Sequence, residues 1–463
     1  MSKRPDTAYG IFMNSLVRAF RSYDQSLYTI SLSGIRKFIS EEDSTLSYLL
    51  EQLQESGFNI CFTDEKHDLD SICVDWKNED KNTGSFTYQV GYLPSISELS
   101  YRVGLSTPCI LIMRIVARVI SLHTTMYKAL VLDLDDTLWK GTLSEEGAQK
   151  IKENLQSAEG RPFIDFMKFI RHLAEDLGLF VAICSRNDIE EVTSAIDQLD
   201  ESIFPLKGQI DCIVANNNDK SKNLPLVIDQ LSVLPNAIVF IDDNEIVRDD
   251  IKKNCAGVFV PEWRNHYDLI SAILGSCIFD RKELSASAQN RRRIFRIIKA
   301  EKNTNGLPAL SVKPIEDKDH IEARKLYSKS NQFRFSRSTE LIDENCRSAY
   351  FEVYRENGEK LDTAAVITYR ENEGCLIVKN FAMSCRYFEI GLEEFILLFI
   401  NQLSTGKDIL FEYQDTGKNK KVQNLFERYP GAFTPHEDTA MIKFNATEAL
   451  IQSLRENTRL ERI

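Results

Sequence analysis

A short apolar run that ends in a group of acids constrains this chain more than any other feature. Ala129–Leu132 contains no polar side chain, which predicts a strand buried on both faces of a parallel sheet. Asp133, Asp135 and Asp136 follow directly. The chemistry of open α/β sheets collects just past such strand ends. Because like charges packed this closely raise one another's pKa, the sequence predicts a bound cation here, and Mg²⁺ is the natural candidate.

The spacing of these acids also indicates what they can do. Side chains alternate along an extended chain, so Asp133 and Asp135 project on the same side. One carboxylate can then attack phosphorus while the other handles a proton. The alternative is an acidic turn that caps a helix.

Two further predicted strand ends carry groups that can hold a phosphate. Residues 179–184 form an apolar run that ends at Ser185, before a helix expected from Ile189. A hydroxyl beside a helix N-terminus can donate to a phosphoryl oxygen, although a simple helix N-cap is the alternative. After a brief strand over residues 213–215, either Lys220 or Lys222 can reach the same phosphate, and either can instead be a solvated surface charge.

A second acidic cluster follows the apolar residues 237–241. Asp242 and Asp243 stand at this strand end, and a carboxylate there would supply Mg²⁺ with a further oxygen ligand. Four chemically matched strand ends thus occur in one stretch of the chain.

These motifs, in this order, resemble the haloacid dehalogenase (HAD) phosphohydrolase superfamily. The resemblance implies that Asp133 is the nucleophile, Asp135 the general acid and base, and Ser185 and Lys220 the phosphate-binding groups. Lys220 is preferred to Lys222 because the family places lysine directly before a small residue and a helix start. Mg²⁺ would be bound by Asp133, Asp243 and the main-chain carbonyl of Asp135, with Asp242 bracing nearby. The polar interval 143–162 leaves room for a small flap in place of a cap domain.

The residues around the motifs are similar to a narrower group, the FkbH-like glyceryl transferase/phosphatase family. The similar stretches are LVLDLDDTLW, GTLSEEG, AICSRND, NNNDKSKNL and VFIDDNEIVRDD, and the similarity extends over roughly residues 125–435. It implies transfer of a glyceryl group from 1,3-bisphosphoglycerate to the phosphopantetheine thiol of an acyl carrier protein, with removal of phosphate. Asp136, Lys140 and Arg186 stand where the family usually has Asn, Gly and Lys.

The last part of the chain predicts an α+β domain. The order of its elements resembles the acyl-CoA N-acyltransferase (GNAT) fold, which implies a pantetheine arm between splayed strands and its phosphate at the N-terminus of the next helix. Only Gly391 remains of the glycine-rich turn expected there. Cys385, beside Arg386 and before a helix, could accept an acyl group as a thiolate, or it could be a buried small hydrophobe. Residues 418–420 could form a rim for phosphate or for a carrier protein, or a solvated loop.

We therefore expect an N-terminal α/β accessory or docking domain over residues 1–125, a HAD-like domain over 126–280, a helical linker over 281–307 and a GNAT-like domain over 308–463. In the first of these, helices are expected over residues 11–20, 44–53 and 110–123, and strands over 58–62 and 85–90. Two alternatives to the transferase stay open: a phosphatase without acyl transfer, and a carrier-protein-binding scaffold with an inactive HAD core.

Composition limits the compartment and the partners. The net charge of -12 disfavours nucleic acid and anionic membranes as partners. The ten cysteines form no CxxC pair, which favours reduced thiols in a cytoplasmic protein. The most apolar segment, residues 110–120, carries Arg114 and Arg118 and is too short to span a bilayer.

Overall fold

The structure is a computed structural model of the 463-residue chain, which divides into two compact units, Met1–Gln289 and Asn290–Ile463. The helix expected over residues 11–20 and Lys418 lie outside the described residues. The described residues are 27–39, 44–63, 71–79, 83–89, 106–123, 127–276, 278–279, 290–305, 310–316, 321–330, 332–336, 346–355, 357–372, 374–417, 419–436, 441–458 and 460–462.

The first unit begins with a mixed sheet in the strand order β2-β1-β3-β4. The two strands expected here are β2 and β4, and the two expected helices within the described residues are α2 and α4. β1 and β3 were not predicted, although both bury alternate apolar side chains, such as Ile72, Val74 and Trp76 on β3. The bounds are β1 Tyr28–Ser33, β2 Phe58–Thr63, β3 Ser71–Asn78, β4 Thr83–Gln89, α2 Ser44–Glu55 and α4 Thr107–His123.

A second sheet in this unit is entirely parallel and has the strand order β7-β6-β5-β8. β5 lies inside this sheet with every residue buried, as its uninterrupted apolar sequence predicts. Parallel strands end on the same edge of a sheet, so the residues that follow the four strands are brought together there. The strands are β5 Ala129–Leu132, β6 Phe180–Ser185, β7 Cys212–Ala215 and β8 Ile238–Ile241.

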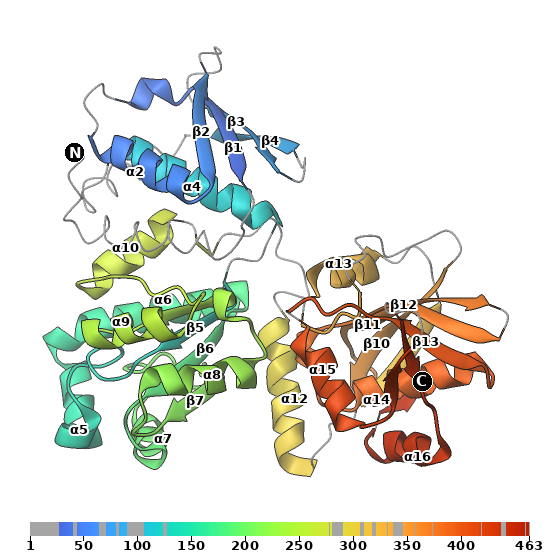
Figure 1. The fold of residues 1–463 in the computed structure, drawn as a ribbon. Coiled ribbons are helices and arrows are strands. Elements are labelled where there is room, and N and C mark those ends of the chain that lie inside the picture. Colours follow the sequence, from blue (N-terminus) through green and yellow to red (C-terminus); the bar gives the residue numbers. More distant parts are fainter. Residues whose placement is uncertain are drawn as a thin grey trace. The chain divides into compact units, whose positions relative to one another are not determined.

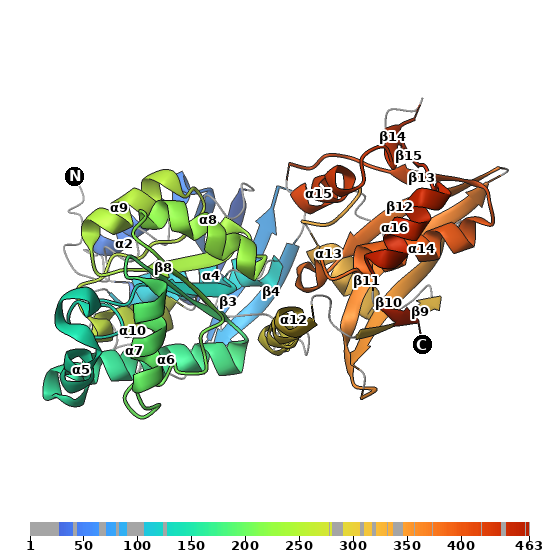
Figure 2. The same ribbon diagram turned by 90° about the horizontal axis from the view of Figure 1, so that it is seen from below.

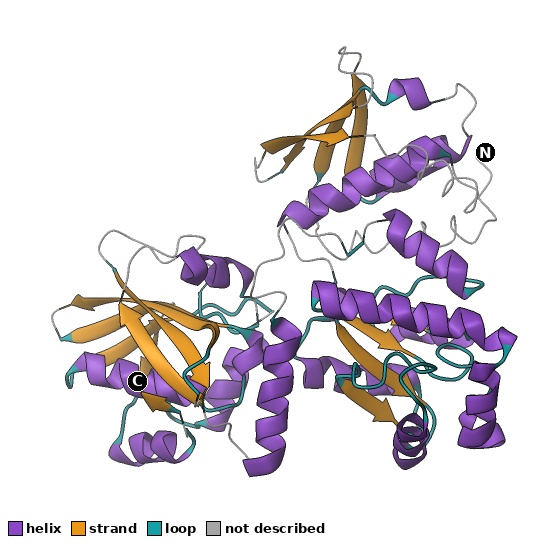
Figure 3. Ribbon diagram, turned by 180° about the vertical axis from the view of Figure 1, so that it is seen from behind, coloured by secondary structure: helices purple, strands orange, loops and turns teal. Residues whose placement is uncertain are grey.

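Helices cover both faces of this parallel sheet (Figures 1 and 3). The interval 143–162, which the sequence left room for only as a small flap, is mostly the helix α5. Ile151 and Leu155 lie four residues apart on one face of α5 and are buried, which explains why the segment is helical. Between β5 and β6 the described chain forms only α5, a 3₁₀ turn and α6, without a separate cap domain. The helices are α5 Leu143–Gln156, α6 Arg161–Leu177, α7 Ile189–Gln198, α8 Lys220–Leu231, α9 Glu245–Asn254 and α10 His266–Ser276.

The second unit is built on an eight-stranded sheet with the order β14-β15-β13-β12-β11-β10-β9-β16. β12 and β13 are parallel neighbours, and α14 connects them. α14 contacts α16 and packs against β12 and β13 (Figure 2). The strands are β9 Leu310–Glu316, β10 Arg347–Arg355, β11 Lys360–Asn372, β12 Cys375–Met383, β13 Asp408–Glu412, β14 Phe433–Pro435, β15 Met441–Phe444 and β16 Glu461–Arg462. The helices are α12 Arg291–Asn305, α13 Ile321–Lys329, α14 Leu392–Ser404, α15 Lys420–Arg428 and α16 Glu448–Glu456.

Two expectations about the environment can be compared with the fold. In the described part of the chain, no helix is both long and apolar enough to cross a membrane. The nine described cysteines are all free thiols.

Candidate active site

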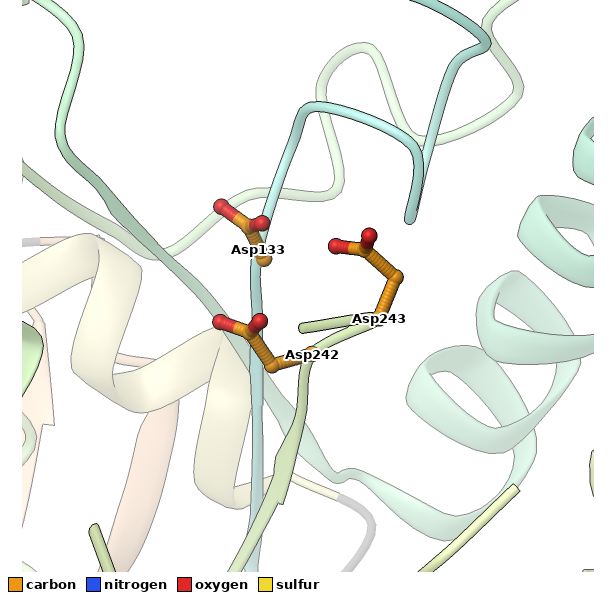
Figure 4. A group of neighbouring side chains, drawn as sticks. All are labelled: Asp133, Asp242 and Asp243. Carbon is orange, nitrogen blue, oxygen red and sulfur yellow. The ribbon is translucent and has the colours of Figure 1, made fainter. Parts of the chain in front are cut away.

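Three carboxylates meet at the edge of the parallel sheet. Asp133 follows β5, and Asp242 and Asp243 follow β8, whose last residue pairs with that of β5. One carboxylate oxygen from each lies within 4.8 Å of the others, and Figure 4 shows the three side chains turned toward a common point. Backbone pairing fixes this approach, because the Asp133 N–H donates to the Ile241 carbonyl at 3.0 Å.

Lys220 lies in the middle of this group. It is the first residue of α8, and its Nζ is 2.5 Å from Asp133 Oδ1 and 2.7 Å from Asp242 Oδ2. The side chain is only 4% exposed. Lys222 is exposed and pairs instead with Asp219 at 2.9 Å. Of the two lysines that the sequence left open, the structure therefore brings Lys220 to the acidic group.

The acidic group has a shortage of positive charge. Burial raises the pKa of Asp133 to about 7, although Lys220 acts to lower it. Burial also acts to lower the pKa of Lys220, but Asp133 and Asp242 outweigh it and the pKa is raised. The pKa of Asp243 is raised by burial and by the charge of Asp242. A site with three crowded carboxylates and a single lysine suits a hard divalent cation that prefers oxygen ligands, such as Mg²⁺.

Ser185 ends β6 and is buried at the same edge of the sheet. It does not cap the following helix, because Asp188 is the N-cap of α7 and accepts from the Glu190 N–H. The helix-cap alternative for Ser185 is thus excluded. Its neighbour Asn187, which the sequence reasoning missed, donates from Nδ2 to Ser185 Oγ at 3.0 Å and to Asp135 Oδ2 at 2.8 Å.

The Asp135 carboxylate points to different partners from those of Asp133. Its Oδ1 accepts from Trp139 Nε1 at 2.8 Å and from the Leu143 N–H at 3.1 Å. The next residue, Asp136, has a φ of 52° and accepts the Gly141 N–H on Oδ1. Asp and Asn are the side chains that tolerate this left-handed conformation best.

Three further side chains, to which the sequence assigned no role, support the second acidic strand end. Buried Arg248 donates from Nη1 to the carbonyls of Asp242 and Asp243, at 2.9 and 2.5 Å. Thr137 Oγ1 accepts the Asp243 N–H at 3.1 Å. His266 Nε2 lies 2.9 Å from the Thr137 carbonyl and must donate to it, because a carbonyl can only accept. Burial lowers the pKa of His266. Thr137 and Arg248 stand within the stretches LVLDLDDTLW and VFIDDNEIVRDD, but only the fold shows what they contact, and His266 lies outside every motif.

Two exposed cations of the first unit, Lys140 and Arg186, lie in ion pairs. Lys140 pairs with Glu159, and Arg186 pairs with Asp219 at 3.3 Å. Both pairs are solvent-exposed, so neither is expected to contribute more than about 1 kcal/mol to stability.

In the second unit, the region between the splayed ends of β12 and β13 is filled by the chain itself. The two strands pair only from Cys375 to Val378 on β12. Beyond that point, Phe335 donates its N–H to the Phe381 carbonyl at 3.0 Å, and the Met383 N–H donates to the Phe333 carbonyl at 3.1 Å. On the other side, the Gln414 N–H donates to the Phe335 carbonyl at 2.8 Å.

This filling segment is firmly packed. Phe333 and Phe335 are almost completely buried, and Asn419 donates to the Arg334 carbonyl at 3.0 Å. The resemblance to GNAT proteins places a pantetheine arm in this gap, but here residues 333–335 use the hydrogen-bonding groups of β12 that such an arm would need. An arm could lie along this part of β12 only if residues 333–335 moved away.

The start of α14 is also unlike an anion site. Gly391 precedes it with a φ of 89°, and the first turn carries Glu393 and Glu394, both buried. Glu393 Oε1 accepts the Glu389 N–H at 3.0 Å, so a carboxylate occupies a donor that a phosphate could use.

Cys385 lies just before this helix, at the start of a 3₁₀ turn. Its side chain is half-buried and packs against the apolar core of the second unit. The neighbouring Arg386 forms a buried ion pair with Asp362. Of the basic rim expected at residues 418–420, Asn419 is fully buried and Lys420 is exposed at the start of α15.

One comparison with known proteins matches the parallel-sheet domain. Residues 128–272 match the family described as NLI interacting factor-like phosphatase. No match was found among curated proteins. The solved structures include the N-terminal part of a Bacteroides fragilis protein containing a phosphatase domain, complexed with Mg. It is 21% identical, with a TM-score of 0.37, and the match covers 52% of this chain and 62% of that one.

Two further solved structures match a shorter part of the chain. A subfamily IA hydrolase of the HAD superfamily from Geobacter sulfurreducens is 14% identical, with 32% of this chain and 98% of that chain covered and a TM-score of 0.22. The cobalt-bound deoxy-D-mannose-octulosonate 8-phosphate phosphatase from Haemophilus influenzae is 13% identical, with 34% and 92% covered and a TM-score of 0.22. The matched stretch, residues 128–272, is a HAD-like phosphatase domain, a kind of domain for which Mg²⁺ is the typical cofactor.

Proposed function

We propose that this protein is a Mg²⁺-dependent phosphotransferase that forms a phosphorylated aspartate on Asp133. The observation that carries the proposal is the convergence of Asp133, Lys220, Asp242 and Asp243 at one edge of the parallel sheet. Ser185 and Asp135 join the same edge through Asn187. This set contains a nucleophile, a proton carrier and phosphate-binding donors, which together suffice for phosphoryl transfer.

The side chains divide the reaction into two steps. In the first, an Asp133 oxygen attacks phosphorus, the bond from phosphorus to the leaving oxygen breaks, and Asp135 gives that oxygen its proton. In the second, Asp135 takes a proton from water, whose oxygen attacks phosphorus; the bond from phosphorus to the Asp133 oxygen breaks, which restores the carboxylate and releases inorganic phosphate. Lys220 and the Ser185 hydroxyl hold the phosphoryl oxygens as charge moves onto them.

A metal ion would be held by carboxylate oxygens of Asp133 and Asp243, with the Asp135 carbonyl as a further ligand. When bound, Mg²⁺ screens the repulsion between the carboxylates and the phosphoryl group. Asp242 keeps Lys220 in place through their 2.7 Å ion pair.

Phosphate release from small phosphate monoesters tests this proposal. The full chain with Mg²⁺ should release phosphate, Asp133→Asn should lower kcat at least about a thousandfold, and Lys222→Met should match the wild type. Trapped phosphoprotein, measured by intact mass, should appear in the wild type and not in Asp133→Asn. Undiminished turnover by Asp133→Asn would refute the role of this aspartate.

The finer proposal is that the group transferred is a glyceryl group. The three-carbon donor would be 1,3-bisphosphoglycerate, the acceptor would be the phosphopantetheine thiol of an acyl carrier protein, and the HAD-like site would remove the remaining phosphate. The sequence resemblance over roughly residues 125–435 supports this proposal. The lack of a separate cap between β5 and β6 supports it too, because an uncapped site can accept a phosphate on a large carrier.

In this proposal, the second unit is a GNAT-like domain and Cys385 is a covalent acyl acceptor. The protein, donor, Mg²⁺ and a cognate carrier protein should give a phosphate-free glyceryl adduct on the carrier by intact mass. Cys385→Ala should abolish the adduct and spare phosphatase turnover, whereas Cys375→Ala should affect neither. An adduct that forms equally well with Cys385→Ala would remove the cysteine from the route.

A phosphatase without acyl transfer is the second candidate. The gap filled by residues 333–335 favours it, because no pantetheine arm can lie between β12 and β13 while these residues are in place. Phosphate release without a carrier adduct, from every carrier tested, would select this candidate.

A further inference from the structure

Asn187 makes contacts that a structural asparagine in a turn would not need. It is 6% exposed and lies two residues after Ser185, in the turn between β6 and α7. Its Nδ2 carries two hydrogens, and the two acceptors in reach are Asp135 Oδ2 at 2.8 Å and Ser185 Oγ at 3.0 Å. The opposite orientation of the amide would place its oxygen against a carboxylate, so the network itself fixes which atom is the nitrogen.

These contacts settle the direction of the Ser185 hydroxyl. A hydroxyl has two acceptor positions and one hydrogen. Both acceptor positions of Ser185 Oγ are used, by the side chain of Asn187 at 3.0 Å and by its backbone N–H at 3.2 Å. Within the described part of the chain no residue accepts the hydroxyl hydrogen, which is left to donate to a phosphoryl oxygen.

The same amide distinguishes the two oxygens of Asp135. Oδ1 accepts from both Trp139 and the Leu143 N–H, so its positions are filled. Among the described residues, Oδ2 accepts from Asn187 alone and keeps one position open. Oδ2 is therefore the oxygen that can exchange a proton with the leaving group or with water, while Oδ1 anchors the carboxylate.

We propose that Asn187 is a positioning residue that couples the phosphate-holding hydroxyl of Ser185 to the proton-transfer oxygen of Asp135. Trp139 completes the arrangement from the other side, since its indole N–H fixes the anchored oxygen. This inference rests on the proposed phosphatase function. It adds that the Asn187 amide holds both the Ser185 hydroxyl and the Asp135 carboxylate. Loss of this side chain should therefore disturb phosphate binding and proton transfer together.

The test compares two esters on the full chain with Mg²⁺. p-Nitrophenolate leaves without needing a proton, whereas an alkyl leaving group, as in glycerol phosphate, needs one. Asn187→Ala should lower kcat/KM for p-nitrophenyl phosphate by about tenfold, through Ser185, and for the alkyl ester by a further factor of about 10 to 100, through Asp135. Asn187→Asp keeps the shape but loses the donors, and should show the same unequal loss. Trp139→Phe, which keeps the buried ring, should affect mainly the alkyl ester.

A double-variant cycle separates positioning from a structural role. In the Asp135→Asn background, Asn187→Ala should cost no more on the alkyl ester than on p-nitrophenyl phosphate, because the proton transfer is already lost. Asn254→Ala, which removes an exposed asparagine of α9, is the control and should match the wild type. Equal losses on both esters, or additive losses in the cycle, would overturn the inference while leaving the phosphatase intact. A wild type that hydrolyses neither ester would overturn the proposed function and this inference with it.

Discussion

Replacing Lys220 by Met should destabilise the first unit strongly in the absence of Mg²⁺. Lys220 is the only cation that pairs with the carboxylates of Asp133 and Asp242 among the described residues, and Asp242 is completely buried. At an effective dielectric constant of about 20, one ion pair at about 4 Å is worth roughly 4 kcal/mol. Two pairs at 2.5 and 2.7 Å would give more, but the cost of desolvating the lysine offsets part of that gain.

The expected loss for Lys220→Met is therefore about 3–5 kcal/mol in the free energy of unfolding, the usual cost of breaking a buried pair and leaving the charge behind. Mg²⁺ should return a large part of it, because a divalent cation can neutralise the same carboxylates and stabilises whichever state binds it.

Urea unfolding followed by tryptophan fluorescence measures this directly. All three tryptophans, Trp76, Trp139 and Trp263, lie in the first unit, so the signal reports that unit alone. Lys222→Met is the matched control and should change the unfolding free energy by less than about 0.5 kcal/mol, since that side chain is exposed. The electrostatic reasoning is refuted if Lys220→Met without Mg²⁺ is no less stable than this control.

Three other results are expected. Burial raises the pKa of Asp133 to about 7, and Mg²⁺ binding needs the ionised carboxylate, so calorimetry should show Mg²⁺ affinity falling by about tenfold per pH unit below pH 7, with proton release; a flat profile from pH 5 to 8 would contradict this. Burial, assisted by Glu394, raises the pKa of Glu393 to about 7. The stability that protonated Glu393 contributes is complete below pH 4.5 and is lost as pH rises to about 7. Over this range the free energy of unfolding of Glu393→Gln should therefore rise relative to that of the wild type by on the order of 2–3 kcal/mol, measured by hydrogen exchange of α14. A difference between the two proteins that does not change with pH would argue against this reasoning. Arg248→Ala should weaken Mg²⁺ binding by about 10- to 100-fold, because two carbonyls of the Asp242–Asp243 turn lose their donor, and Lys252→Ala is the control; equal Mg²⁺ affinities would show that the turn holds its shape unaided.

The sequence alone determined the strands of the parallel-sheet domain and the residue types at their ends. Apolar runs such as Ala129–Leu132 predict buried parallel strands because no polar side chain interrupts them, and the structure has these strands. The acids and the hydroxyl were identified from residue type and from their place at strand ends. The helix α5 was harder to predict from the polar interval 143–162, because it depends on a few apolar residues at helical spacing within a charged sequence.

Only the tertiary structure decided which groups act on one another. Lys220 and Lys222 have the same chemistry and lie two residues apart, but the first turn of α8 points one into the acidic group and the other into solvent. Asn187 and Arg248 lie within the motifs, but their positions in the sequence do not show which groups they contact, and His266 reaches the site from α10, outside every motif. The filled gap between β12 and β13 depends on residues more than 40 positions away in the chain, so its hydrogen bonds follow from packing and not from local sequence. Local patterns fix strands because they need only neighbouring residues, whereas the partners of a buried charge are set by the whole fold.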